Sequence, residues 1–352
     1  MTTGPHLDPG GDVASRSDRA VAALYGLAIG DALGMPTQLM SSRQVATRLG
    51  RIEGFRAATP DHPLAAGLPA GSVTDDTEQA LLLAQLLVQG RGHVDPQRFA
   101  ARLVAWEDDM RARGSLDLLG PSTKAAVAAI AAGASVAEAG RWGTTNGAAM
   151  RVTPVGLVMA SDDLSALVDR VEETTVISHH TGVAIAGAAA VAAAVSAGID
   201  GASAAEVVAT AVTAAALGER RGSWVAGGSV ARRIAWAVSL VAPTDPERSL
   251  ADLEALVGTS LATQESVPTA FGVVATFPGQ PWEAVLAAAN LGGDSDTIAA
   301  LVGAMAGASR GPSGFPESAR TTVTAVNALE LESVATALLA LRPAAAETRR
   351  PT

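Results

Sequence analysis

Thr74-Asp75-Asp76-Thr77 is followed by an apolar run, Ala80-Leu81-Leu82-Leu83-Ala84-Gln85-Leu86-Leu87, and this order of acidic residues before an apolar stretch occurs again. The second case is Asp294-Ser295-Asp296-Thr297, which opens another Ala-rich stretch 220 residues later. Ala is the strongest helix former, and alternating β-branched runs are scarce in this chain. The sequence therefore predicts an all-α fold, a single compact multi-helix bundle.

The predicted helices cover most of the chain. They span 18–34, 75–89, 96–112, 122–132, 146–159, 163–176, 181–197, 203–216, 225–240, 247–257, 266–276, 282–289, 295–308, 317–327 and 329–341. The longest gap, 43–71, contains Pro60, Pro63 and Pro69 and is predicted to be an extended loop, where a lid could lie. No repeat of fixed period and no shift in composition divides the chain. We expect one domain over 18–343, with flexible tails at 1–17 and 344–352.

Composition excludes several classes of protein. Hydrophobic residues make up 48% of the 352 residues, which indicates a globular chain. A formal charge of −10 and only 3% aromatic residues argue against nucleic acid as a partner. The chain has no Cys, so disulfides and thiolate zinc sites are excluded. The Ala-rich run 183–199 is predicted to be a buried helix rather than a membrane span, and we expect a cytoplasmic protein with no membrane partner.

The two acidic clusters are the first candidate site. Clustered carboxylate and hydroxyl oxygens are the ligands of hard divalent cations such as Mg²⁺ and Mn²⁺. Four carboxylates that converge repel one another unless some are protonated or cations lie between them. Asp294 and Asp296, two residues apart, could reach one ion, with Thr297 adding an oxygen. The alternative is that each cluster only caps the helix that it precedes.

Two further stretches could bind a ligand. The first is Arg141-Trp142-Gly143-Thr144-Thr145-Asn146-Gly147-Ala148-Ala149-Met150-Arg151, where small residues at a helix start offer free N–H groups. Asn146 could orient a sugar or base, and Arg151 could pair with a phosphate. A loop that leads into a core helix is the alternative. The pair His179-His180 is unsuited to joint ligation, because adjacent residues on a helix point about 100° apart. His179 as a ligand contact and a structural pair of cap histidines are both compatible with the sequence.

With these residues in place, the chain resembles the ADP-ribosylglycohydrolase family, which includes dinitrogen-reductase-activating glycohydrolase and the ADP-ribosyl-acceptor hydrolases. The resemblance spans about 18–340. The motifs that carry it are Gly26-Leu27-Ala28-Ile29-Gly30-Asp31-Ala32-Leu33-Gly34, Thr74 to Thr77, Thr145 to Arg151, Ser178-His179 and Gly292-Gly293-Asp294-Ser295-Asp296-Thr297. Within the family, 119–123 and 263–268 resemble a bacterial branch of poorly defined substrate.

The resemblance implies an all-α fold with a central cleft that holds two divalent cations, Mg²⁺ or Mn²⁺. The residues carried over as metal ligands are Thr74, Asp75, Asp76, Asp294, Asp296 and Thr297. Those expected to contact the substrate are Gln38, Asn146, Gly147, Ala148, Arg151 and His179. The family cleaves a bond at the anomeric carbon of ADP-ribose, so we expect a hydrolase of N- or O-ribosyl bonds. Its partner would be a small ribosyl or ADP-ribosyl compound or an ADP-ribosylated protein, and no feature of the chain sets its oligomeric state.

One position departs from the family pattern. The family usually has Glu where this chain has Gln38, and a Gln side chain cannot move a proton at neutral pH. The role of base could pass to Asp75, Asp76 or Asp294, which are therefore the expected catalytic residues. The alternative function is a non-catalytic sensor of ADP-ribose or a nucleotide, which keeps the pocket without the base.

Overall fold

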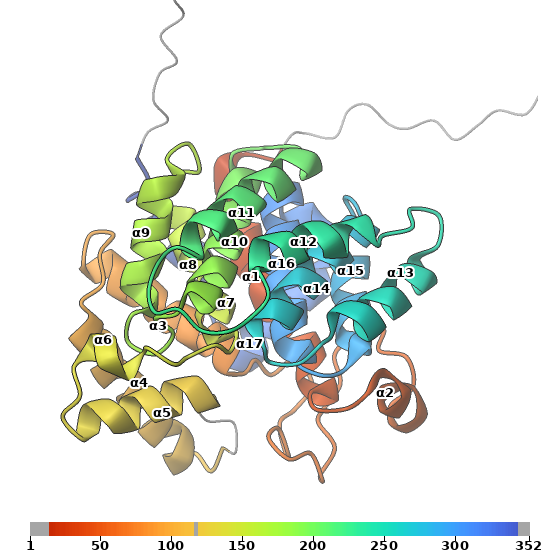
Figure 1. The fold of residues 1–352 in the computed structure, drawn as a ribbon. Helices are drawn as coiled ribbons and strands as arrows, with labels where there is room; N and C mark the ends of the chain where they lie inside the picture. Colours follow the sequence, from red (N-terminus) through yellow and green to blue (C-terminus); the bar gives the residue numbers. More distant parts are fainter. Residues whose placement is uncertain (1–13, 116–118, 344–352) are drawn as a thin grey trace, which may run out of the picture.

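The computed structural model describes residues 14–115 and 119–343. In those ranges the chain forms helices joined by loops, with three isolated β-bridges and no β-strand (Figure 1). The prediction of an all-α fold is confirmed. The predicted tails at 1–17 and 344–352 lie largely outside the described residues, and Arg16 and Ser17 already belong to the first helix.

The helices follow one another along the chain with short connections. In chain order they are α1 Arg16–Gly34, η1 Met35–Thr37, α2 Ser42–Arg48, α3 Asp75–Gln89, α4 Pro96–Ala112, α5 Pro121–Ala131, α6 Val136–Ala139, α7 Gly147–Met150, α8 Thr153–Val158, α9 Leu164–Thr175, α10 Gly182–Ile199, α11 Ala204–Gly218, α12 Val230–Ser239, α13 Pro246–Asp252, η2 Leu253–Val257, α14 Thr263–Thr276, α15 Pro281–Leu291, α16 Ser295–Arg310, η3 Pro312–Gly314, α17 Glu317–Asn327 and α18 Leu331–Leu339.

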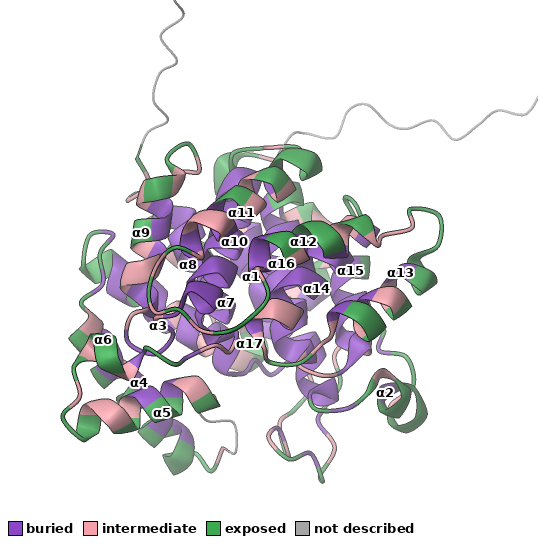
Figure 2. Ribbon diagram, viewed as in Figure 1, coloured by how far each residue is buried: buried purple, intermediate pink, exposed green. Residues whose placement is uncertain are grey.

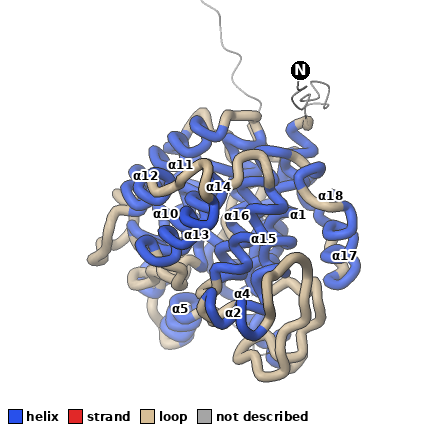
Figure 3. The backbone as a smooth tube through the Cα atoms, turned by 90° about the vertical axis from the view of Figure 1, so that its right-hand side faces the viewer, coloured by secondary structure: helices blue, strands red, loops and turns tan. Residues whose placement is uncertain are grey.

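Helices α1 and α16 pack with their backbones in contact. A Cβ atom built on Gly26 would lie 2.0 Å from the carbonyl oxygen of Gly303, and one on Gly30 would lie 2.0 Å from that of Ala299. One turn further on, a Cβ on Gly34 would lie 2.4 Å from the Asp296 Cα. The glycines of α1 recur every four residues and so share one face of the helix. Figures 1 and 3 show the two helices together in the middle of the bundle.

Helix α10 is the other central element. All 18 of its residues are buried, and Figure 2 draws it in the purple of buried residues. By length and composition, Arg16–Thr37 and Gly182–Ile199 could cross a membrane, but 94% and 100% of their apolar windows are buried inside the fold. The predicted burial of 183–199 is confirmed.

Local signals explain where the predicted helices match and where they fail. Helix α4 begins as predicted, because Asp95 caps it and Pro96 occupies its first turn. The prediction of one loop over 43–71 is wrong at its start, where Ser41 and Gln44 form a capping box for α2. The prediction of one helix over 146–159 is also wrong. The chain breaks between α7 and α8 just before Pro154, whose ring cannot continue a helix.

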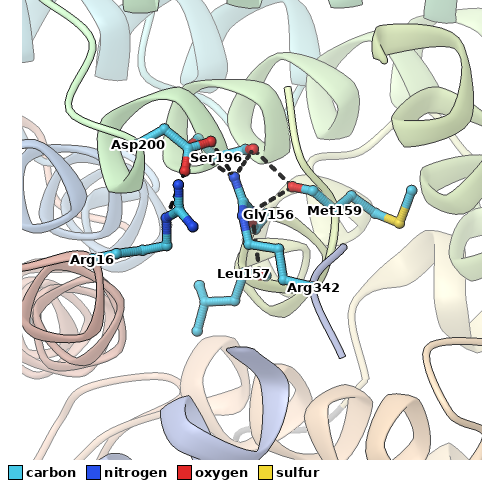
Figure 4. A network of polar contacts seen from close by, with 7 residues as sticks. All are labelled: Arg16, Gly156, Leu157, Met159, Ser196, Asp200 and Arg342. Carbon is cyan, nitrogen blue, oxygen red and sulfur yellow. Dashed lines mark hydrogen bonds and ion pairs between the residues drawn. The ribbon is translucent and has the colours of Figure 1, made fainter. Parts of the chain in front are cut away.

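Arg342 joins the end of the described chain to the core (Figure 4). Its side chain is only 3% exposed and donates to the carbonyl oxygens of Gly156 at 2.9 Å and Met159 at 2.6 Å. It also donates to Ser196 Oγ at 2.9 Å and pairs with Asp200, which in turn pairs with Arg16 at 2.9 Å. One guanidinium therefore satisfies carbonyl groups at the end of α8 and connects α8 to α10, and the Asp200–Arg16 pair connects the end of α10 to α1.

The close contact of α1 with α16 predicts a clear effect of one added methyl group. Gly30→Ala should lower the free energy of unfolding by about 1–3 kcal/mol, because overpacking outweighs the gain in helix propensity. Urea unfolding would measure the change. The matched control is Gly54→Ala, where nothing lies within 4 Å of the added Cβ and the change should stay within about 0.5 kcal/mol. Equal stability of the two variants would contradict a backbone contact at Gly30.

Candidate functional site

The site starts from a carboxylate that belongs to α1 and caps α3. Asp31 is fully buried and accepts hydrogen bonds from Thr74 N at 2.9 Å and Thr77 N at 3.1 Å. It also accepts from the hydroxyls of Thr74 at 2.7 Å and Thr77 at 2.6 Å. These bonds satisfy free N–H groups at the start of α3. The interpretation of the Thr74–Thr77 cluster as the cap of its own helix is therefore wrong, since Thr74 makes no side-chain cap bond.

The second cluster does not cap its helix either. Asp294 is the N-cap residue of α16, but its side chain makes no cap bond. It accepts a hydrogen bond from Asn146 Nδ2 at 2.5 Å instead. Neither N-cap residue, Thr74 or Asp294, therefore caps its own helix through its side chain.

The structure brings the two acidic clusters together. Thr297 Oγ1, on α16, donates to Asp76 Oδ2, on α3, at 3.2 Å. Asp76 is 1% exposed and Asp296 is fully buried. The Gln38 amide, from the turn after α1, donates to the Asp296 carboxylate. Stretches far apart in the sequence thus meet where the end of α1 lies against the start of α16.

The gathered carboxylates are hard to ionise together. Burial raises the pKa of Asp76 well above its usual value, and the charges of Asp296 and Asp75 raise it further. Burial also raises the pKa of Asp31 to about 6, although the bonds from Thr77 and Thr74 oppose the shift. The pKa of Asp294 is raised by burial as well, against the hydrogen bonds from Asn146 and Thr297. A positive charge placed among these groups would favour their ionised forms.

The donor set suits a hard cation, but amide groups already donate to three of the carboxylates. Gln79 Nε2 donates to Asp75 Oδ2 at 3.1 Å, as Asn146 does to Asp294 and Gln38 to Asp296. No three His, Asp or Glu side chains within 14–115 and 119–343 are arranged to hold a metal ion. Asp76 Oδ1 is buried and accepts no hydrogen bond from the described residues. A buried carboxylate oxygen without a donor is costly, and a cation would satisfy it.

A cavity of about 130 Å³ opens onto this cluster. The predicted site residues in its wall are Gln38, Asp75, Asp76, Asn146, Gly147, Asp294 and Thr297. Thr74, Asp296 and Ala148 are buried beside it and do not form its wall. Leu64, from the segment 43–71, also lines the cavity, so this segment does reach the site.

Arg151 and His179 lie behind the wall. Arg151 is 1% exposed and His179 is fully buried, and neither lines the cavity. The expectation that both contact a ligand directly does not match this placement. Burial, with the charge of Arg151 in second place, lowers the pKa of His179 well below its usual value, so the ring is neutral at pH 7. His180 pairs with Glu172 at 2.9 Å, away from its neighbour.

Asp31, Gln79 and Thr123 take part in the site but were not predicted as site residues. Asp31 is the one charged residue between Ala20 and Gly34, and an acid alone on an apolar helix is a signal that could have found it. Gln79 donates to Asp75, and Thr123 lines the cavity. In the sequence, both are ordinary residues of a predicted helix. Nothing in the local pattern distinguishes them.

The raised pKa values predict an unusual dependence of stability on pH in metal-free protein. An Asp in the unfolded chain has a pKa of about 3.9. Between that pH and the raised pKa values of Asp31 and Asp76, the folded state binds more protons, so the free energy of unfolding falls as pH rises. The lowered pKa values of His179 and His62 act in the opposite direction below about pH 6.5, as two groups against the three carboxyls of Asp31, Asp76 and Asp294, whose pKa values are raised.

Asp76→Asn isolates one of these carboxyls. In EDTA the variant should be more stable than the wild type at pH 7.5, by about 1.4 kcal/mol for each unit of pKa shift that it removes. Its stability should also fall less steeply between pH 5 and pH 7.5. Urea unfolding across this range would measure both, and identical pH profiles would contradict a repelled, buried Asp76.

Comparison with known proteins gives consistent results. A family model described as ADP-ribosylglycohydrolase matches residues 12–348. The Escherichia coli K12 protein YegU, described as uncharacterised, is 34% identical over 328 residues, covering 93% of this chain and 98% of that protein. The ADP-ribosyl-[dinitrogen reductase] glycohydrolase of Rhodospirillum rubrum is 31% identical over 140 residues, 40% of this chain and 44% of that protein. A solved structure described as an ADP-ribosylglycohydrolase-related protein complex has a TM-score of 0.70 at 25% identity, covering 93% of this chain and 99% of that chain.

Proposed function

Because the chain belongs to the ADP-ribosylglycohydrolase family, we propose that it hydrolyses an N- or O-ribosyl bond at the anomeric carbon of ADP-ribose or a related ribosyl compound. The family is hydrolytic, and the two acidic clusters that its motifs predict meet at one cavity in this chain. That meeting of Asp76 with Asp296 and Thr297 is the observation that carries the proposal.

We assign two divalent cations, Mg²⁺ or Mn²⁺, to this cluster. Thr74, Asp75 and Asp76 would hold one, and Asp294, Asp296 and Thr297 the other. The buried Asp76 Oδ1 and the excess of carboxylates support the assignment. When bound, the cations would supply positive charge that holds vicinal ribose hydroxyls and acidifies a water molecule.

Side chains in the cavity wall would carry out proton transfer, charge stabilisation and orientation of the sugar. Asp75, Asp76 and Asp294 line the cavity, and one of them would accept a proton from the attacking water. The same carboxylates would stabilise positive charge on the ribose ring in an oxocarbenium-like transition state. Asn146, held by Ser266 Oγ at 3.0 Å and by Asp294, has a fixed amide that could orient the sugar.

The size of the cavity limits what enters it. Pockets for whole ligands are commonly about 300–1,000 Å³, whereas this one is about 130 Å³. We infer that the ribosyl ring enters and that the rest of the substrate extends outwards past Leu39 and Leu261, which line the cavity and are 54% and 41% exposed. The proposed partner is a ribosyl or ADP-ribosyl compound or an ADP-ribosylated protein. We propose that the protein acts on it in the cytoplasm.

A second candidate function is supported by Gln38. Its amide donates to Asp296, where the family's Glu would add another carboxylate. A chain that kept the pocket but lost that acid could bind ADP-ribose or a nucleotide without cleaving it. The sensor and the hydrolase make opposite predictions for the same variant.

The test measures turnover of ADP-ribosyl-arginine, ADP-ribosyl-serine and simple nucleosides in Mg²⁺. We expect the wild type to hydrolyse at least one of them, and Asp76→Asn to lose about 10²-fold or more of kcat/KM, since it removes a carboxylate from the reacting centre. No turnover of any of these compounds, with metal bound, would overturn the hydrolase.

Gln38→Glu separates the two functions in the same assay. If the protein is a hydrolase, the wild type, with Gln38 in place, already hydrolyses a ribosyl compound. For a sensor, hydrolysis appears only after the substitution, because Glu restores a group that can move a proton. Binding of ADP-ribose by a wild type that is inactive, together with activity of Gln38→Glu, would establish the sensor.

A further inference from the structure

Arg151 is a buried cation that donates hydrogen bonds to two neutral side chains. Its guanidinium faces the Phe99 ring, with 5.1 Å from its central carbon to the ring centre. Nη1 donates to Gln79 Oε1 at 3.1 Å, and Nη2 donates to Ser178 Oγ at 2.7 Å. A guanidinium can only donate, so it fixes the direction of both hydrogen bonds.

The first branch leads to the acidic cluster. Gln79 Oε1 accepts from Arg151, so the amide nitrogen of Gln79 is the end that faces Asp75. That nitrogen donates to Asp75 Oδ2 at 3.1 Å. The orientation of the Gln79 amide, and with it the donor to Asp75, therefore follows from the position of Arg151.

The second branch leads through His179 to the opposite wall. Ser178 Oγ accepts from Arg151, and His179 Nδ1, at 2.7 Å, is the one acceptor that its hydroxyl hydrogen has among the described residues, so the hydroxyl donates to Nδ1. A ring nitrogen that accepts carries no proton, which places the proton of the neutral ring on Nε2. His179 Nε2 then donates to Thr145 Oγ1 at 2.9 Å, and Thr145 donates to Ser122 Oγ at 2.9 Å.

We propose that Arg151 is a positioning residue that sets the direction of hydrogen bonds on two sides of the cavity. Through Gln79 it orients Asp75, and through Ser178 it fixes the Nε2–H tautomer of His179 and the hydroxyl of Thr145. Asp75 and Thr145 both line the cavity. The consequence for substrate binding rests on the proposed function, whereas the tautomer does not.

The hydrogen-bond chain that begins at Arg151 ends at Ser122, and its direction leaves the Ser122 hydroxyl able to donate. Ser122 Oγ accepts from Thr145, so its own hydrogen remains to be donated. Ser122 lines a neighbouring hollow between α5 and α6, on the other side of Pro121, which both hollows share. The Ser122 hydroxyl can therefore donate to a substrate acceptor beside it, such as a hydroxyl, carbonyl or phosphate oxygen. Burial lowers the pKa of Arg151 to about 10, so the cation that orders the chain is charged at pH 7.

The experiment is long-range ¹H–¹⁵N NMR of the histidine rings in full-length, metal-free protein at pH 7.5. The chain has five His residues, and His179→Gln identifies the signals of this one. We expect a single neutral tautomer with the proton on Nε2. A proton on Nδ1, a protonated ring or a mixture of tautomers in the wild type would overturn the inference.

Variants then test whether Arg151 is the source. Ser178→Ala should give a mixture of tautomers, because Nδ1 loses its donor and the Thr145 hydroxyl can reverse. Arg151→Met should do the same, since Ser178 Oγ can then accept from Nδ1–H; should it fail to fold, Ser178→Ala still decides. Ser122→Ala, at the far end, is the matched control and should keep the pure Nε2–H form. A pure form in Ser178→Ala would overturn the role of the chain.

These readouts are independent of turnover. A wild type that hydrolyses no ribosyl compound but shows the pure Nε2–H tautomer would contradict the proposed function and leave the hydrogen-bond chain standing. Hydrolysis by a wild type with the other tautomer would have the reverse meaning. Where turnover is found, Ser178→Ala should lower kcat about tenfold or more without a matching rise in KM, because the groups are present but less well oriented.

Discussion

Glycines on α1 and α16 allow the two backbones to touch, and the position of the site depends on that contact. Gly26 and Gly30 lie on carbonyl groups of α16, and Gly34 lies on Asp296 itself. The last of these contacts places the end of α1, which carries Asp31 and leads to Gln38, directly against the start of α16. Side chains larger than hydrogen at these positions would separate the helices and with them the carboxylates. Gly26, Gly30 and Gly34 therefore determine both the packing of the two helices and the position of the carboxylates.

The acidic cluster is unfavourable by itself, and the fold uses Asp31 to organise it. Asp31 caps α3 from another helix, and the N-cap residue Thr74 makes no side-chain cap bond of its own. Amide groups of Gln38, Gln79 and Asn146 then each donate to one carboxylate. Burial still raises the pKa of both Asp76 and Asp294, and for Asp76 the charges of Asp296 and Asp75 raise it further. Such a cluster is poised to bind positive charge.

The sequence predicted those parts of the fold that local chemistry determines. Helix α4 has a capping Asp95 followed by Pro96, and its bounds match. Helix α2 was missed because prolines dominated the interpretation of 43–71, although Ser41 and Gln44 carry a capping signal. The kink before Pro154 was readable as well, but Ala-rich propensity on either side outweighed it. In both cases the sequence contained the local signal, but the prediction gave more importance to a competing one.

The site divides in the same way. The acidic clusters and Asn146 were visible in the sequence because acids and amides beside glycines are conspicuous, and they line one cavity. Arg151 and His179 were visible too, but whether a side chain faces a cavity or lies behind its wall depends on tertiary packing. Gln79 became part of the site only because α3 faces Arg151.

Anomalous diffraction from crystals grown with Mn²⁺ tests the central claim most directly, that helix packing assembles a cation site from two distant acidic stretches. The account predicts anomalous density bonded to oxygens of both Asp76 and Asp296, at the distances of about 2.0–2.2 Å typical of small divalent ions. Density elsewhere on the folded protein, or none at millimolar Mn²⁺, would contradict it.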